Sequence, residues 1–341
     1  MTSRERTLGF IKGEPVDRPP FHPLIMRWAA RYAGVKYGAF CQDYRQKCVA
    51  AIRCAEDFGI DWVTVGSDPY SEAQAFGVQV EFPEDDLPLE RGGLLEDLME
   101  ADRIKPYRVG DHIRLVDRLN IVRHFKELTG DRYFVVGWAE GPIAEYGHIR
   151  GLGNASLDFF DEPETVHRIL DVIVESALDF ISEQIKAGAD CIGIGDAFCS
   201  QIGPELYREF AFEREKRMVD HIHSLGAIAK LHICGNTSKI LRDMIKTGAD
   251  ILDIDHLVPS MSPFAPLLNN GQVFCGNSDP VAIVQNGSAA VIRESVKRCF
   301  EDASGRCIVS AGCEITPETS HENMRFFAEA CKIGNADESV V

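Results

Sequence analysis

The feature that most constrains the fold is a unit that recurs along the chain: an amphipathic helix, a glycine, a short turn and a buried strand. Residues 164–186 show its helix most clearly, because apolar residues recur there at helical spacing and Gly188 follows as a stop signal. The segments 185–190 and 245–250 share the pattern Ile-Lys-x-Gly-Ala-Asp, and an apolar run follows each. Helices that alternate with buried strands in this way predict a parallel sheet.

Eight short apolar runs are the candidate strands. They are rich in Val, Ile and Phe and do not alternate strictly with polar residues, as expected of strands buried on both faces. They span residues 21–26, 62–65, 133–137, 191–194, 227–232, 251–254, 272–275 and 307–311. Eight such units predict an α/β protein: a (β/α)₈ TIM barrel with an N-terminal extension, forming a single domain over residues 1–341. An open doubly wound sheet is the competing architecture, but no Gly-x-Gly-x-x-Gly follows any run.

Residues 69–132 interrupt this regular pattern. The segment is long, partly acidic and irregular, and it follows the second candidate strand. Long segments of this kind in compact domains commonly cover binding sites. We therefore expect an insertion, or lid, over the barrel mouth.

Composition narrows the possible partners and the compartment. The formal net charge of the 341 residues is −17. A surface of that charge repels phosphate backbones and anionic lipid, so we expect neither a nucleic-acid nor a membrane partner. The first residues are polar, without the apolar core of a signal peptide, and no run approaches the roughly 18 apolar residues of a membrane helix. Most of the 11 cysteines lie in apolar runs as expected of buried free thiols, so we expect a cytoplasmic protein.

Two cysteines differ because they lie where predicted strands end. His232 and Cys234 are two residues apart, so their side chains point to the same side of one strand, and Cys313 follows the last strand. Barrels place their active sites at these carboxyl ends, and imidazole and thiolate suit Zn²⁺. Ordinary packing is the competing interpretation of this pattern. Cys275 is a rival third ligand, but Cys313 is favoured because it lies past its strand.

The ligand set indicates a catalytic rather than a structural metal. Three ligands from two strand ends leave a fourth position open, whereas structural zinc sites use close pairs of cysteines, which the chain lacks. Two thiolates and a neutral imidazole bring the net charge of a zinc site to zero. Such a metal acidifies water poorly and is better suited to holding a thiol as a nucleophilic thiolate.

Other polar residues also end predicted strands or begin the loops after them. Glu140 is a candidate catalytic residue that could occupy the fourth zinc position or bind substrate. Asp196 and His256 are further catalytic candidates, and Asn277 and Asp68 are candidate cofactor-binding residues. Converging acids are costly unless they meet a cation or hydrogen-bond donors. Helix capping and turn formation are the competing interpretations for the aspartates and for Asn277.

The whole chain resembles the uroporphyrinogen decarboxylase superfamily, and the segments that carry the resemblance are spread over its length. They are Arg4-Glu5-Arg6, Lys12–Pro20, Glu140-Gly141-Pro142 and Gly276–Pro280. Within that superfamily, His232-Ile233-Cys234-Gly235-Asn236-Thr237 together with Gly312-Cys313-Glu314 looks like the zinc signature of the corrinoid-dependent methyltransferase branch. The resemblance implies a bound Zn²⁺, and it makes a homodimer an expectation.

The resemblance implies one of two methyltransferase roles. In the first, a methyl group moves from a small methoxylated or N-methylated compound to the cobalt of a separate corrinoid protein. In the second, it moves from that cobalt to a thiol such as coenzyme M. The chain shows no cobalamin-binding segment of its own, so we expect the corrinoid (cobalamin) on a partner protein. The acidic loop from Glu140 to Glu145 leads us to favour the first role.

Two further classes remain as alternatives. A tetrapyrrole decarboxylase is one, because Arg27 and Arg31 partly resemble the arginine-rich stretch that grips substrate carboxylates in such enzymes, with Asp196 as the acid. The Gln and Gly of that stretch are missing here, and those decarboxylases lack the zinc thiolates. A non-catalytic corrinoid- or metal-binding protein is the other.

Overall fold

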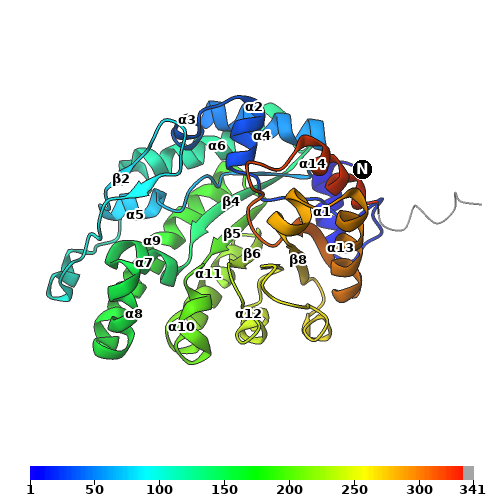
Figure 1. Cartoon of the computed structure of the whole chain (residues 1–341). Helices are drawn as coiled ribbons and strands as arrows, with labels where there is room; N and C mark the ends of the chain where they lie inside the picture. Colours follow the sequence, from blue (N-terminus) through cyan, green and yellow to red (C-terminus); the bar gives the residue numbers. More distant parts are fainter. Residues whose placement is uncertain (333–341) are drawn as a thin grey trace, which may run out of the picture.

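The computed structural model describes residues 1–332, and a curled parallel sheet of seven strands forms its centre (Figure 1). The strand order is β1-β4-β5-β6-β7-β8-β9. The strands are β1 (Trp62–Thr64), β4 (Phe134–Glu140), β5 (Cys191–Gly195), β6 (Ile228–Ile233), β7 (Ile251–Ile254), β8 (Val273–Ser278) and β9 (Cys307–Ala311). Seven of the eight predicted runs are therefore strands, with ends that differ by up to three residues.

The first predicted run, residues 21–26, is not a strand. Its one ladder contact is an isolated parallel bridge between Phe21 and Val309 of β9. Backbone hydrogen bonds nevertheless connect this run to β9 and to the start of β1. The His22 N–H donates to Val309 O at 2.9 Å, and the Asp61 N–H, beside β1, donates to Phe21 O at 2.9 Å. Pro23 lacks the N–H that a longer ladder needs. The α/β class is confirmed, but the sheet is a half-barrel of seven strands rather than the predicted eight.

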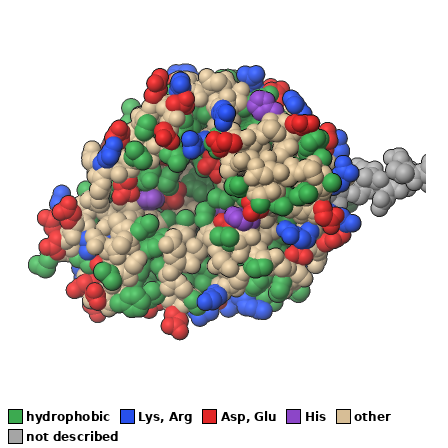
Figure 2. Space-filling model, in the orientation of Figure 1, with side chains coloured by type: hydrophobic (Ala, Val, Ile, Leu, Met, Phe, Trp, Pro, Cys, Tyr) green, Lys and Arg blue, Asp and Glu red, His purple; other side chains and the backbone are tan. Residues whose placement is uncertain are grey.

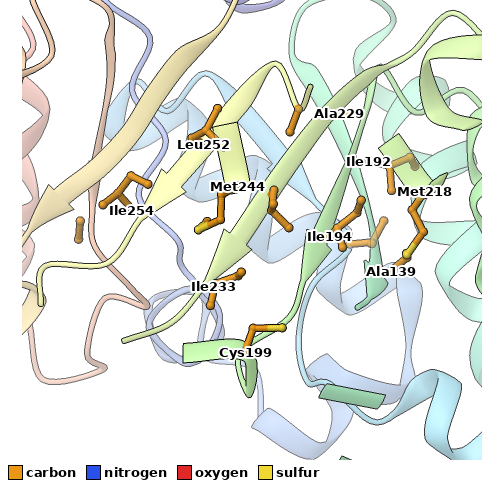
Figure 3. Close-up of a cluster of buried hydrophobic side chains, with 14 of the residues drawn as sticks. Ala139, Ile192, Ile194, Cys199, Met218, Ala229, Ile233, Met244, Leu252 and Ile254 are labelled. Carbon is orange, nitrogen blue, oxygen red and sulfur yellow. The ribbon is translucent and has the colours of Figure 1, made fainter. Parts of the chain in front are cut away.

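Helices pack on the outer face of this sheet (Figure 1). Those in contact with strands are α4 (Tyr44–Phe58), α6 (Ile113–Thr129), α9 (Pro163–Ala187), α11 (Phe212–Ser224) and α13 (Ala289–Asp302), and α12 (Leu241–Lys246) and α14 (His321–Ala330) lie beside them. The predicted helix at 164–186 is confirmed as α9, and Gly188 ends it with a left-handed φ of 114°. Figure 3 shows the resulting core, in which Ile194 and Ile233 of the sheet pack with Met218 and Met244.

An apolar plug fills the lumen below the carboxyl ends of the strands. Ile11 of α1 (Ser3–Ile11) packs there with buried strand residues Trp62, Phe134, Val136, Cys191, Ile251, Val273, Cys275 and Ile308. Because these side chains block the amino-terminal end, a ligand can approach the lumen only from the opposite end. α2 (Arg27–Ala33) and α3 (Tyr37–Gln42) lie between residue 26 and α4.

Residues 69–132 form both regular and irregular structure. The segment contains α5 (Ser71–Phe76), the antiparallel pair β2 (Val80–Glu81) and β3 (Leu89–Glu90), the 3₁₀ helices η1 (Leu98–Arg103) and η2 (Val109–Asp111), and α6. α6 packs on β4 as the other outer helices pack on their strands, so the irregular part ends near residue 112. A lid role for this segment stays a prediction.

The remaining connections lie between strands and outer helices. They include α7 (Pro142–Arg150), α8 (Leu152–Asp161), α10 (Cys199–Leu206) and the π-helical turn η3 (Tyr207–Ala211), with η4 (Ala265–Leu267) and η5 (Pro280–Gln285) later in the chain. Within residues 1–332, every helix is too short or too polar to cross a bilayer.

Candidate metal centre and its cavity

A cavity of about 260 Å³ opens at the carboxyl ends of the strands. Five residues singled out from the sequence line it: Asp68, Glu140, His232, Cys234 and Cys313. The face drawn in Figure 2 is hollowed near its centre, with acidic and basic side chains interspersed around the hollow. The other lining residues are His22, Leu24, Met26, Thr64, Gly66, Ser67, Pro69, Val136, Trp138, Gly195, Ala197, Lys230 and Glu314.

Three of these side chains converge on one point at the cavity wall. The Nε2 atom of His232 lies 3.1 Å from Sγ of Cys234, which lies 3.9 Å from Sγ of Cys313, and all three donor atoms lie within 4.8 Å of one another. A tetrahedral Zn²⁺ with ordinary bond lengths separates two thiolate sulfurs by about 3.8 Å and a nitrogen from a sulfur by about 3.6 Å. The donors present therefore fit this metal after a shift of about half an ångström in the His–Cys edge.

Local backbone geometry brings the two loops of this centre together. Gly235 follows Cys234 with φ of 92°, a left-handed conformation that turns the chain away after the ligand. At Gly312 a Cβ would lie 2.1 Å from the backbone N of His256, so only glycine lets the loop after β9 approach the loop after β7 this closely. That approach places Cys313 against the loop after β7, and Asp255 of the same loop accepts a hydrogen bond from the Gly235 N–H, next to Cys234, at 2.8 Å.

The three donor side chains and the groups around them shift one another's pKa. The hydrogen bond with Cys234 lowers the pKa of the Cys313 thiol to about 5, and the same bond raises the pKa of Cys234. Burial by itself lowers the pKa of His232, but the Asp253 carboxylate outweighs burial and raises it to about 10. The cluster thus favours a thiolate beside an imidazolium, and a divalent cation would displace those protons.

A buried polar layer lies directly beneath His232. Asp253 of β7 is paired in register with His232, and its Oδ2 lies 3.4 Å from the ring Nδ1. The same oxygen lies 2.6 Å from Nζ of Lys230, which in turn lies 3.5 Å from Nε2 of His22. A carboxylate behind a metal-bound histidine fixes the ring and its tautomer. Lys230 holds that carboxylate ionised, since its ammonium and His232 lower the pKa of Asp253 against the effect of burial.

Trp138 and Glu140 form another wall of the cavity. The indole lies against β5, where a Cβ at Gly193 or Gly195 would come within 2.5 and 2.4 Å of it. Its Nε1–H donates to Oε1 of Glu140 at 2.8 Å. Burial, and then the neighbouring Glu72 carboxyl, raise the pKa of Glu140. This shift disfavours the charged form of Glu140, which stands outside the cluster of His232, Cys234 and Cys313.

Asp68 also faces the cavity, but its charge is balanced by the helix behind it. Arg114 of α6 contacts both carboxylate oxygens at 2.7 and 2.6 Å, and Arg118 contacts Oδ2 at 2.9 Å. These two guanidinium groups keep the pKa of Asp68 low although the carboxylate is buried. These ion pairs hold α6 against the cavity wall. Cofactor binding by Asp68 stays a prediction.

Three candidates lie outside the cavity. Asp196 accepts hydrogen bonds from the N–H groups of Ala144 and Ile143 at 2.7 and 3.3 Å, so it caps α7, which follows the neighbouring strand β4 rather than its own strand. His256 lies between Asp255 and Asp279, with nitrogen–oxygen distances of 3.0 and 3.6 Å.

Asn277 is the third, and its amide donates to Val258 O at 2.8 Å. Its side chain is engaged behind β8, away from the three zinc-type donors. Catalysis by Asp196 and His256 and cofactor binding by Asn277 thus gain no support from their positions.

Sequence reasoning missed three residues of the polar layer: His22, Lys230 and Asp253. Lys230 carried a usable signal, because it precedes His232 by two residues and so points to the same side of β6. Asp253 is a charge inside an apolar run, which is costly without a partner. The partner itself depends on the register between β6 and β7, which no local pattern specifies.

Comparison with known proteins identifies relatives along the whole chain. A family model described as "Uroporphyrinogen decarboxylase (URO-D)" matches residues 2–333. A methylcobamide:CoM methyltransferase MtbA from Methanosarcina mazei is 28% identical over 97% of this chain and 98% of its own. A uroporphyrinogen decarboxylase from Parasynechococcus marenigrum is 27% identical over 94% of each. A solved structure of a methyltransferase from Methanosarcina mazei, 22% identical, superposes with a TM-score of 0.87 over 97% of this chain and 98% of its own. The expected resemblance and the expected enzyme class, a methyltransferase, are confirmed.

Proposed function

The chain belongs to the uroporphyrinogen decarboxylase family, and from that premise we propose that it is a zinc-dependent methyltransferase that moves a methyl group from the cobalt of a corrinoid protein to a small thiol. The observation that carries the proposal is the convergence of His232, Cys234 and Cys313 on one wall of the cavity. Three protein donors leave the cavity side of the metal to a substrate. The relatives named methylcobamide:CoM methyltransferases support both a corrinoid donor and a thiol acceptor.

The chemistry divides between the metal and the residues around it. Bound Zn²⁺ would hold the acceptor's sulfur as a thiolate at neutral pH, the form that attacks carbon. Asp253 keeps the Nε2 of His232 turned toward the two thiolates. In the transfer, a carbon–sulfur bond forms as the carbon–cobalt bond breaks, and the electron pair of the broken bond stays on cobalt. The walls made by Leu24, Met26 and Trp138 exclude water from this step.

The structure supplies a physical reason to prefer a thiol acceptor over the methylated donor favoured from the sequence. That preference rested on a charged acidic loop beside the metal. Burial raises the pKa of Glu140, Glu145 and Glu72, and two arginines compensate Asp68. Burial also raises the pKa of Glu314, the remaining carboxyl among the described lining residues, to about 7. The lining carboxyls therefore carry less negative charge than their number suggests, and this favours a thiol over a cationic methylated substrate.

A decarboxylase acting on a polycarboxylate is a poor fit to this cavity. Arg27 and Arg31, the residues that partly resemble the carboxylate-gripping stretch, line a separate surface groove next to α2. Among the described residues that line the cavity, Lys230 is the one lysine or arginine. The volume of about 260 Å³ is also below the roughly 300–1,000 Å³ typical of pockets for drug-sized ligands.

The test is a transfer assay with the zinc-loaded chain, methylcob(III)alamin and a thiol panel. We expect a thioether in the mass spectrum and loss of the methyl–cobalt absorbance. The transfer rate should rise with the zinc content of the protein and level off at one zinc per chain. Cys234→Ala should lose both zinc and transfer. Methylation of Co(I) corrinoid by methoxylated aromatics or methylamines, without transfer to any thiol, would show that the methylated-donor role is correct instead.

A further inference from the structure

A buried lysine lies behind the cavity without an ionic partner. Lys47 of α4 is 1% exposed, its Nζ donates to Gly66 O, and that nitrogen lies 4.1 Å from the centroid of the Phe40 ring. Within the described residues it forms no ion pair, since the nearby Asp68 carboxylate pairs with two guanidinium groups instead. Burial, and then the neighbouring Arg118, lower the pKa of Lys47 to about 7, so the charged form is costly at this position. An apolar side chain of similar length would avoid that cost, which indicates a role for the nitrogen itself.

The atom that Lys47 contacts belongs to a run of three consecutive backbone carbonyls just after β1. Each carbonyl accepts a hydrogen bond from a buried side chain on a different helix. The pairs are Val65 O with Nη1 of Arg118 on α6 at 2.7 Å, Gly66 O with Nζ of Lys47 on α4, and Ser67 O with the hydroxyl of Tyr37 on α3. Because β1 ends at Thr64, these three helices supply the donors that a further strand would otherwise give.

The anchored backbone forms one wall of the cavity that holds the candidate metal ligands. Gly66, Ser67 and Asp68 line that cavity, and we call these three residues the β1 wall. Ser67 is held twice, because its hydroxyl also accepts from Arg118 at 2.8 Å, and Asp68 is held by its ion pairs with α6. Gly66 has no side chain, so the contact of its carbonyl with Lys47 holds the middle of the wall. Loss of this contact would move the wall without touching any of the three candidate ligands.

We propose that Lys47 is a positioning residue for methyl transfer, which fixes the Gly66 carbonyl and thereby holds the β1 wall in the place that the reacting groups need. Its role in transfer rests on the proposed function, whereas its hold on the wall does not. An amine donates an N–H to a carbonyl with or without its extra proton, so the contact survives loss of the charge. Lys47 acts through the wall, because its side chain lies behind the residues that line the cavity.

Replacing Lys47 by methionine removes the nitrogen and fills the same space with apolar atoms. We expect one zinc per chain and a Tm at or above the wild-type value, since an amine no longer has to be buried. Hydrogen-exchange mass spectrometry should nevertheless show faster exchange in the peptide that covers residues 65–70. In the transfer assay with methylcob(III)alamin and a thiol, kcat/KM should fall by about tenfold to 100-fold, as expected when a positioning group moves by a fraction of an ångström to one ångström.

Two further variants separate positioning from a merely structural role. Lys47→Gln keeps an N–H donor on a side chain one bond shorter, so it should recover part of the lost transfer although its buried amide makes it less stable than Lys47→Met. Stability and transfer then rank these two variants in opposite orders, which a structural role alone would not produce. Lys297→Met changes an exposed lysine on α13 and should leave exchange over residues 65–70, zinc content and kcat/KM at their wild-type values.

The outcomes distinguish this inference from the proposed function. Wild-type exchange over residues 65–70 and wild-type kcat/KM in Lys47→Met would overturn it. A fall in transfer that only follows a lower Tm or a lost zinc would assign Lys47 to the fold instead. If the wild-type chain methylates no thiol, the proposed function fails together with a role of Lys47 in transfer. Faster exchange over residues 65–70 in Lys47→Met, at an unchanged Tm, would then still support its hold on the β1 wall.

Discussion

Replacing Asp253 by leucine tests whether the layer beneath His232 serves the metal or only the fold. Asp253 and Lys230 form a 2.6 Å ion pair with side chains 5% and 1% exposed. Removing one partner of such a pair leaves a buried charge and costs about 3–5 kcal/mol of stability. For a chain of 341 residues that corresponds to a fall in Tm of roughly 4–7 °C. Loss of a carboxylate behind a metal-bound histidine independently costs about 10–100-fold in metal affinity.

The double variant Lys230→Met/Asp253→Leu distinguishes these two effects. It removes both charges, and buried ion pairs replaced by apolar residues of similar size commonly lose little stability. We therefore expect the double variant to recover most of the Tm while its zinc affinity remains about 10–100-fold below wild type.

Thermal unfolding of the zinc-free proteins measures the first quantity, and competition with a chromophoric zinc chelator measures the second. Wild-type zinc affinity in Asp253→Leu would refute an orienting role for Asp253. Full recovery of affinity in the double variant would assign the loss to the unpaired Lys230 charge instead.

Three further substitutions test other parts of the site. The Cys275→Ser variant should keep one zinc per chain by metal analysis, because Cys275 lies in the apolar plug below the cavity. Serine at His232, Cys234 or Cys313 should instead lose the zinc. Loss of zinc from Cys275→Ser would show that Cys275 is a ligand after all. Burial raises the pKa of Glu72 to about 8, so its protonation stabilises the fold fully below pH 4.5 and this contribution is lost as the pH rises through about 8. Urea unfolding should therefore show wild type losing stability relative to Glu72→Gln over that range, and parallel pH profiles would contradict the shift. Gly195→Ala places a Cβ 2.4 Å from the Trp138 ring and should cost about 1–3 kcal/mol in urea unfolding, whereas Gly153→Ala, with open space around it, should not.

Local patterns were enough to predict that the side chains of His232, Cys234 and Cys313 lie close together, because the information was local. The two-residue spacing of His232 and Cys234 specifies one side of a strand, and the end of a strand specifies the mouth. The choice of Cys313 over Cys275 followed from position relative to a strand, and the structure places Cys275 well below the ligand cluster. Zinc occupancy of these ligands stays a prediction.

Tertiary burial decided the parts that sequence reasoning got wrong or missed. Glu140 was predicted as a possible fourth zinc ligand or substrate-binding residue, but sequence reasoning missed that α5 brings Glu72 to its backbone N–H, where burial and then the Glu72 carboxyl raise the pKa of Glu140. His22 was predicted to lie in a regular strand over residues 21–26. The prolines there limit strand pairing to one isolated bridge, and the His22 imidazole lines the cavity. Each case depends on residues more than 60 positions apart in the chain, which a local pattern cannot pair.

The two faces of β6 explain how the strand register that positions the site is fixed. Its lumen face carries Lys230 and His232, in order from floor to mouth, with Cys234 directly after the strand. The opposite face carries Ala229, Leu231 and Ile233, each fully buried, and Figure 3 shows Ala229 and Ile233 in the cluster with Met218 and Met244. A slip of one residue in register would turn the polar set into this apolar cluster, at a cost of several kcal/mol for the buried charge alone. The outer core therefore fixes the register, and the register places Lys230, its carboxylate partner Asp253 and the candidate metal ligands at successive depths of one cavity.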